Sequence, residues 1–110
     1  GASVAFGSDW GPDNPFEQMQ FAETQEFCNE GTCTHRHHHR ITREESLKAC
    51  TVNAARAMQW SDIGALAPGF HADMIVVDRD PSTCPVEDLA DTKVLATFLG
   101  GEAVHDTGVM

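Results

Sequence analysis

A short apolar segment that ends abruptly in turn residues does most to constrain the fold of this chain. Residues 2–6 read ASVAF, and Gly7-Ser8-Asp9 follow directly. A continuous apolar run bounded by turn residues is typical of a strand buried within a sheet. We therefore expect an α/β fold in which Asp9 lies just past a buried strand, where such folds place catalytic groups. On local sequence alone, a residue that caps the turn is the favoured interpretation of Asp9.

A strong helix-start signal follows. Asn14 is a favoured N-cap, Pro15 suits the first helical position and Glu17 stands at the third. We expect a helix from Pro15 to about Phe27, because apolar residues then recur at helical spacing. The expected buried stripe of this helix is Phe16, Met19 and Ala22.

A second helix is predicted over residues 43–58. Thr42 and Glu45 have the spacing of a capping box, and Thr51 favours a kink partway along. The apolar stripe consists of Leu47, Cys50, Ala54 and Met58. Within that stripe, Cys50 is interpreted as a small core residue rather than a nucleophile.

The C-terminal half changes to strand patterns. Residues 74–77 read MIVV, which predicts a strand buried on both faces. Residues 85–91 fit one helical turn, and residues 94–105 fit a hairpin that turns at Gly100-Gly101. His71 and Asp73 lie in a turn, where Asp usually bonds local backbone rather than a ligand.

Charge and cysteine content exclude several classes of partner. The 110 residues carry a net charge of -10, from 17 acidic residues against 7 Lys and Arg. We expect neither nucleic acid nor membrane as a partner, because phosphate binding needs a basic surface and no apolar run approaches the roughly 20 residues of a membrane helix. No signal-peptide pattern is present, and the four cysteines match no small disulfide scaffold. We therefore expect reduced thiols in a cytoplasmic protein.

Residues 28–40, CNEGTCTHRHHHR, follow no period and are interpreted as a loop. His35 and His37 have the spacing of a His-x-His metal pair, and Cys28 and Cys33 lie nearby. The gaps differ from those of common structural zinc sites. We expect weak, adventitious metal binding here, because histidine-rich tracts bind metals readily.

Four motifs in series resemble the end of the amidohydrolase superfamily, and in particular the amidohydrolase-3 group with its N-substituted formamide deformylase-like members. The motifs are GSDWGPDNPFEQM, ITREESLKACTVNAARAM, IGALAPGFHADMIVVDRDP and TKVLATFLGGEAVHD. The resemblance covers nearly the whole chain except residues 28–40.

The resemblance implies a fragment of a larger α/β enzyme. Residues 1–60 would hold the last strand and helices of a (β/α)8 barrel, and residues 61–110 would belong to a small β-sandwich; folded alone, the piece would be α+β. Asp9 matches the family aspartate that binds a divalent metal, expected to be zinc, and exchanges a proton with the attacking water. The substrate would be a small amide-type molecule. Trp10 follows Asp9 directly, so it is a candidate to line the substrate pocket and equally a candidate to cover an exposed part of the core.

Two other functions stay open at the level of sequence. One is a stand-alone, non-catalytic α+β interaction module, and the other is a small zinc-binding module on residues 28–39. Separated from a barrel, the chain is expected to self-associate through residues 2–6 or 94–105, because unpaired strand edges invite pairing.

The resemblance generates a first prediction. The family's remaining metal ligands, a His-x-His pair, a bridging carboxylate or carboxylated lysine and two histidines, have no counterpart on this chain, and a catalytic zinc needs about three protein ligands. We expect the purified 110-residue chain to hydrolyse neither amide nor formamide substrates when zinc is added. Metal-dependent turnover that disappears in Asp9→Asn would contradict this.

Overall fold

The computed structural model describes all residues except 10, 30–31 and 36, and describes the backbone but not the side chains of residues 27–29, 33–35 and 37. Its elements follow in the order α1 (Pro15–Thr24), β1 (Glu26–Asn29), β2 (Thr32–His35), the 3-10 helix η1 (His37–His39), α2 (Arg43–Cys50), α3 (Val52–Ala57), β3 (Met74–Val77), the 3-10 helix η2 (Val86–Asp91), β4 (Val94–Leu99) and β5 (Glu102–Asp106). Among the described helices, none has both the length and the hydropathy to cross a membrane.

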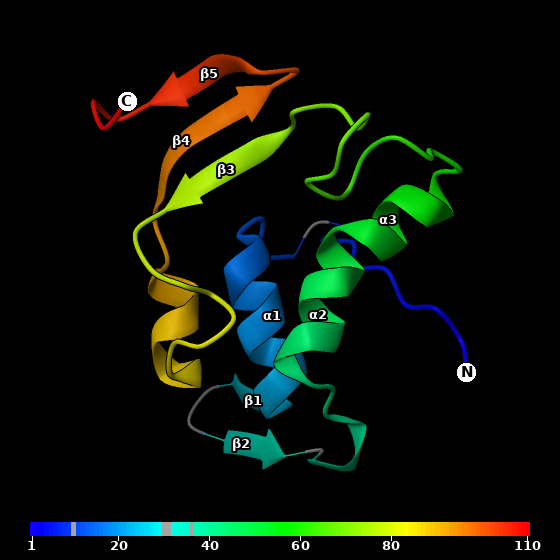
Figure 1. Cartoon of the computed structure of the whole chain (residues 1–110). Coiled ribbons are helices and arrows are strands. Elements are labelled where there is room, and N and C mark those ends of the chain that lie inside the picture. The colour runs from blue at the N-terminus through cyan, green and yellow to red at the C-terminus, as the bar shows by residue number, and fades with distance from the viewer. Residues whose placement is uncertain (10, 30–31, 36) are drawn as a thin grey trace.

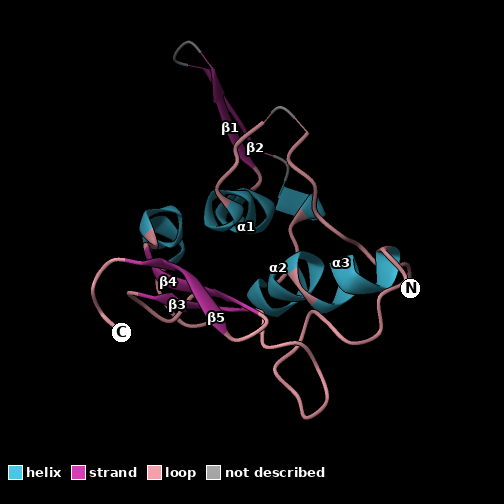
Figure 2. Ribbon diagram, turned by 90° about the horizontal axis from the view of Figure 1, so that it is seen from above, coloured by secondary structure: helices cyan, strands magenta, loops and turns pink. Residues whose placement is uncertain are grey.

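The elements form a small mixed α/β structure. Strands β3, β4 and β5 pair antiparallel in that order, and β1 pairs with β2 in a separate hairpin. The three-stranded sheet and the β1–β2 hairpin lie at opposite ends of the helical layer formed by α1 and α2 (Figure 1). The hairpin projects away from the helices (Figure 2).

The predicted start of α1 is confirmed, whereas its end is earlier than predicted. The Asn14 side chain accepts a hydrogen bond from the Phe16 amide at 2.9 Å. The helix ends at Thr24 because Gln25 takes a left-handed conformation, with φ 53°, and the chain then enters β1. The predicted stripe of Phe16, Met19 and Ala22 is buried.

The core connects α1 with the C-terminal half of the chain. Met19 on α1 is 1% exposed, and Leu89 on η2 is completely buried. Together with Phe16 they form the centre, and the partly buried side chains around them are Phe6, Leu47, Cys50, Val77, Cys84 and Val94.

The predicted break at Thr51 is confirmed, and the predicted stripe is confirmed in part, because Leu47 and Cys50 pack against the core whereas Met58 does not. The Thr42–Glu45 capping box is complete, and α2 and α3 separate at Thr51. Met58 is 63% exposed. The most buried residues of the pair are Ser46, Ala49 and Ala55.

The prediction of a buried strand over residues 2–6 is wrong for this structure. These residues form no strand and are mostly exposed. They run in extended form beside the helices, where the Phe6 amide donates to the Ala49 carbonyl at 3.2 Å and the Asn53 side chain donates to the Val4 carbonyl at 3.0 Å. The physical reason is that a strand needs a neighbouring strand for its backbone groups, and helices α2 and α3 are what lie here instead.

The predicted loop over residues 28–40 and the predicted burial of residues 74–77 also need correction. Residues 28–40 are not a loop, because β1 and β2 form a hairpin and η1 follows them. Strand β3 is not buried on both faces, since Ile75 is 48% exposed. β3 lies at one edge of the antiparallel sheet, with the helices on one side only, so one of its faces has no layer over it.

The predicted C-terminal hairpin is confirmed. β4 pairs antiparallel with β5, and Gly100 and Gly101 have φ values of 58° and 86°, which the tight turn requires. The Asp73 carboxylate accepts a hydrogen bond from the Gly100 amide at 2.8 Å, so its backbone partner lies in the distant β4–β5 turn and not in the local turn that was predicted.

One side chain ties three segments together. The Arg43 guanidinium donates from Nε to the Glu23 carboxylate at 2.6 Å, and from Nη1 to the carbonyls of Pro81 at 2.8 Å and Cys84 at 3.0 Å. Arg43 begins α2, Glu23 is on α1, and residues 81–84 belong to the connection between β3 and η2. The hydrogen bond to Glu23 raises the pKa of Arg43 further above its ordinary value.

Gly64 is required by the close approach of the chain to α3. Its φ is 87°, and a Cβ atom at this position would lie 2.8 Å from the Ala55 side chain and 3.0 Å from the Thr51 carbonyl. Gly69 has the same φ of 87°, but a Cβ atom there would meet nothing within 4 Å. An added Cβ atom would therefore meet backbone strain at both positions, but a steric conflict at Gly64 alone.

We expect Gly64→Ala to destabilise the chain more than Gly69→Ala. Both variants carry the left-handed penalty of roughly 1–2 kcal/mol, and Gly64→Ala adds an overpacking cost of about 1–3 kcal/mol. Urea unfolding of the two variants measures the difference. Equal losses of stability would show that the segment around Gly64 does not pack on α3 as described.

Asp78 links β3 to β4 through a network of hydrogen bonds. Its carboxylate accepts from the Arg79 side chain at 3.0 Å and from the Lys93 amide at 3.0 Å. The Arg79 hydrogen bond, followed by that from Lys93, lowers the pKa of Asp78 from 3.8 to about 2.

A lowered folded-state pKa makes stability depend on pH. The contribution of Asp78 is fully present above its ordinary pKa of 3.8 and is lost as the pH falls through about 2. We expect Asp78→Asn to flatten the loss of stability over this acidic range, measured by thermal melts at a series of pH values. Glu87→Gln, which removes an exposed carboxylate from η2, is the control and should leave the slope unchanged.

Candidate functional site

The predicted catalytic residue Asp9 lies in an exposed turn. The turn is closed by a hydrogen bond from the Gly11 amide to the Ser8 carbonyl at 2.6 Å. Asp9 has φ 50°, a conformation that Asp adopts more readily than most residues. Its exposed carboxylate lies at the end of the N-terminal segment, which is not the buried strand that the sequence predicts.

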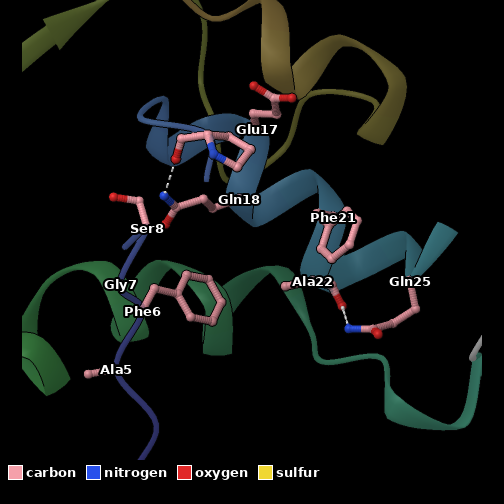
Figure 3. A pocket seen from close by; sticks show the side chains of 10 residues that line it. Ala5, Phe6, Gly7, Ser8, Glu17, Gln18, Phe21, Ala22 and Gln25 are labelled. Atoms are coloured by element: carbon pink, nitrogen blue, oxygen red, sulfur yellow. Dashed lines mark hydrogen bonds between the residues drawn. The ribbon is translucent and has the colours of Figure 1, made fainter. Parts of the chain in front are cut away.

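A pocket of about 530 Å³ lies beside this turn, between the N-terminal segment and α1 (Figure 3). The residues that line it are Ala5, Phe6, Gly7, Ser8, Pro12, Glu17, Gln18, Phe21, Ala22 and Gln25. Phe6 and Phe21 supply apolar surface from opposite walls, whereas Ser8, Glu17 and Gln18 supply polar groups at one end (Figure 3). Such a mixture suits a small molecule with one apolar part and one polar part.

A hydrogen bond fixes one wall of this pocket. The Gln18 side chain donates from Nε2 to the Pro12 carbonyl at 2.7 Å, which holds the segment before α1 against the helix (Figure 3). Asp9 itself does not line the pocket, although its neighbour Ser8 does. The structure therefore brings Asp9 near the pocket without placing its carboxylate inside it.

Sequence reasoning did not find the residues of this pocket. Gln18 on α1 and Gln25 directly after it lie outside the buried stripe of the helix, where polar residues are ordinary. They line the pocket only because the N-terminal segment lies beside α1 in the folded chain. No local signal in the sequence indicates that return.

The described residues do not fit the metal that the family resemblance implies. Among them, no group of three or more His, Cys, Asp or Glu side chains is arranged to hold a metal ion. Asp9 is one carboxylate, and a catalytic zinc takes about three protein ligands. No catalytic step through a metal follows from this set of residues.

The other predicted site residues fall in two groups. Trp10 and the side chains of His35 and His37 lie outside the described residues, so the proposed pocket and metal roles of these three stay predictions. His71 is described, and its Nε2 lies 3.2 Å from the Asp62 carboxylate in an exposed pair. This pair fixes the turn before β3 and makes no ligand set.

Cys50 fits the predicted role of a core residue. Its side chain packs against the core cluster, and burial raises the pKa of its thiol above the ordinary value. Because the thiolate is the reactive form of cysteine, a raised pKa makes the thiol less nucleophilic.

Comparison with known proteins gives matches along the chain. A profile described as "Amidohydrolase family" matches residues 1–105. Imidazolonepropionase of Deinococcus deserti is 34% identical over 109 residues, which are 96% of this chain and 22% of that protein. N-substituted formamide deformylase of Arthrobacter pascens is 36% identical over 62 residues, 56% of this chain and 11% of that protein.

A deaminase gives a similar match. The 5-methylthioadenosine/S-adenosylhomocysteine deaminase of Caldanaerobacter subterraneus subsp. tengcongensis is 36% identical over 97 residues, 81% of this chain and 21% of that protein. The chain thus spans between 11% and 22% of the length of these three relatives. No solved structure matches the chain significantly.

Proposed function

Because the chain belongs to the amidohydrolase family, whose members hydrolyse C–N bonds and are typically metal-dependent, we propose that it is the C-terminal part of an enzyme that hydrolyses an amide-type C–N bond in a small molecule. The family membership expected from the four motifs is confirmed. The observation that carries the proposal is the family match over residues 1–105, which includes Asp9. The finer division into a barrel end at residues 1–60 and a sandwich segment at 61–110 stays a prediction.

The contribution of this chain to the chemistry is the Asp9 carboxylate. Its exposure and its fixed turn leave the carboxylate open to a metal or to water from outside the chain. We assign it the family role of metal ligand and proton acceptor, with zinc as the expected ion. The remaining ligands then come from elsewhere in a longer protein, since the described residues provide no complete set.

A second candidate function is a stand-alone, non-catalytic module, and one observation favours it. The chain closes a core of its own, in which Phe16 and Met19 of α1 pack against Leu89 of η2. Self-association and a cytoplasmic location also stay proposals. Strand β5, whose five residues are all exposed, is the edge that supports self-association.

The gene context and one substitution test the first candidate. We expect the coding sequence upstream of residue 1 to encode a His-x-His pair at the end of a predicted strand. In the longer protein, Asp9→Asn should lower kcat by about 100-fold or more, which is the scale at which single acid–base groups contribute to catalysis.

Asp13→Asn is the matched control, because Asp13 is an exposed carboxylate four positions along the same segment and carries the same change of charge. It should leave kcat unchanged. An upstream sequence without metal ligands, or equal activity in the two variants, would reject the assignment of Asp9 and favour the stand-alone module.

A further inference from the structure

The charges around the pocket between the N-terminal segment and α1 favour an uncharged ligand. None of the described residues that line the pocket is basic, so a carboxylate or phosphate would lose its water there and gain no cation. Glu17 is the one acidic residue among them. Its carboxylate is exposed and points away from the Phe6 and Phe21 rings (Figure 3), so a cationic ligand gains little from it either.

The polar end of the pocket offers one fixed acceptor and one hydroxyl. Gln18 donates from Nε2 to the Pro12 carbonyl at 2.7 Å, which fixes the orientation of its amide and leaves Oε1 as an acceptor. Within the described part of the chain, neither Gln18 Oε1 nor the Ser8 hydroxyl has a hydrogen-bond partner. A carbonyl oxygen only accepts, whereas a hydroxyl also donates. The two groups together complement a secondary amide, which presents one N–H and one carbonyl oxygen.

The rest of the pocket is apolar and aromatic. The Phe6 and Phe21 rings face it from opposite walls (Figure 3), and Phe21 is 42% exposed. Aromatic rings prefer offset or edge-to-face contacts with other rings, so a ring placed between the two walls packs against both. The volume of about 530 Å³ lies within the range of about 300–1,000 Å³ that is usual for small-molecule sites. An aromatic group therefore suits this part of the pocket.

From these contacts we propose that the pocket binds an uncharged secondary amide that carries an aromatic group. The amide N–H donates to Gln18 Oε1, the amide carbonyl accepts from the Ser8 hydroxyl, and the ring lies between Phe6 and Phe21. Ser8 directly precedes Asp9, so the amide is held at the end of the pocket next to the proposed catalytic turn.

The inference deepens the proposed function. That such an amide is the substrate of the longer enzyme rests on that function, because the assignment of Asp9 supplies the hydrolysis. Binding of the amide rests only on the pocket and needs no catalysis. A binding measurement on the 110-residue chain therefore fails or succeeds separately from the Asp9→Asn test in the longer protein.

The test follows the amide NMR signals of the isotope-labelled 110-residue chain during titration with N-benzylacetamide. We expect saturable changes, with one ligand per chain, at residues 5–8 and 17–25. N-benzyl-N-methylacetamide, which lacks the N–H, should bind about 2- to 10-fold more weakly, the scale of one neutral hydrogen bond. Benzoate, which has the ring but carries a negative charge, should produce no saturable change.

Two variants locate the contacts. Ser8→Ala removes the hydroxyl and Phe21→Ala removes one aromatic wall, and each should weaken N-benzylacetamide binding by about 2- to 10-fold. Phe70→Ala is the matched control for Phe21→Ala, because Phe70 is 37% exposed and does not line this pocket. It should leave affinity unchanged.

Several results would overturn the proposal. One is the absence of saturable changes in the unsubstituted chain, which needs no variant to fold. Others are changes centred on the surroundings of Phe70, or equal affinity for the tertiary amide or for benzoate. Unchanged affinity in both Ser8→Ala and Phe21→Ala would likewise reject the pocket as the binding site.

Discussion

The arrangement of the helical layer depends on the hydrogen bonds that the Arg43 guanidinium donates to two other segments. It bonds the Glu23 carboxylate of α1 and two backbone carbonyls of residues 81–84, while its own backbone begins α2. A planar guanidinium presents donors in a fixed fork, so it can hold partners in different directions at once, which a lysine ammonium does less well. The pair is partly shielded, with the two side chains 14% and 30% exposed, and such a pair is screened less than a surface ion pair.

Once α1, α2 and the β3–η2 connection are held together, the core follows. Met19 and Leu89 meet in the space that these segments enclose, and Phe16 completes the cluster. The sheet attaches to this core through Val77 and Val94, whereas β5 stays at its outer edge. Of the three strands, the central β4 holds the buried residue Ala96, whereas every residue of β5 is exposed.

The same arrangement determines what the chain can contribute to chemistry. The extended residues 2–8 run beside α2 and α1, so they place Asp9 in an exposed turn and form a pocket with α1. A single exposed carboxylate cannot hold a catalytic zinc, which fits a chain that spans between 11% and 22% of three related proteins. The β1–β2 hairpin is a separate feature, because its register depends on backbone pairing and not on the core.

The sequence by itself determined the features that depend on residues close together in the chain. The Asn14 cap, the Thr42–Glu45 capping box, the break at Thr51 and the Gly100-Gly101 turn were all predictable, because each involves a hydrogen bond or a backbone conformation within a few positions. The family was likewise readable from the order of motifs, and with it the assignment of Asp9 as the candidate catalytic residue.

Tertiary structure alone decided the features that depend on a distant partner. Residues 2–6 are apolar enough for a buried strand, but no strand lies beside them, and whether one does is not written in those residues. Ile75 belongs to a run typical of a strand covered on both faces, yet it is 48% exposed, because helices cover the sheet on one side only. The pocket of Phe6 and Phe21 and the Arg43 bridge also join segments far apart in sequence. Local chemistry fixes where elements begin and end, whereas the burial of each face depends on which other element packs against it.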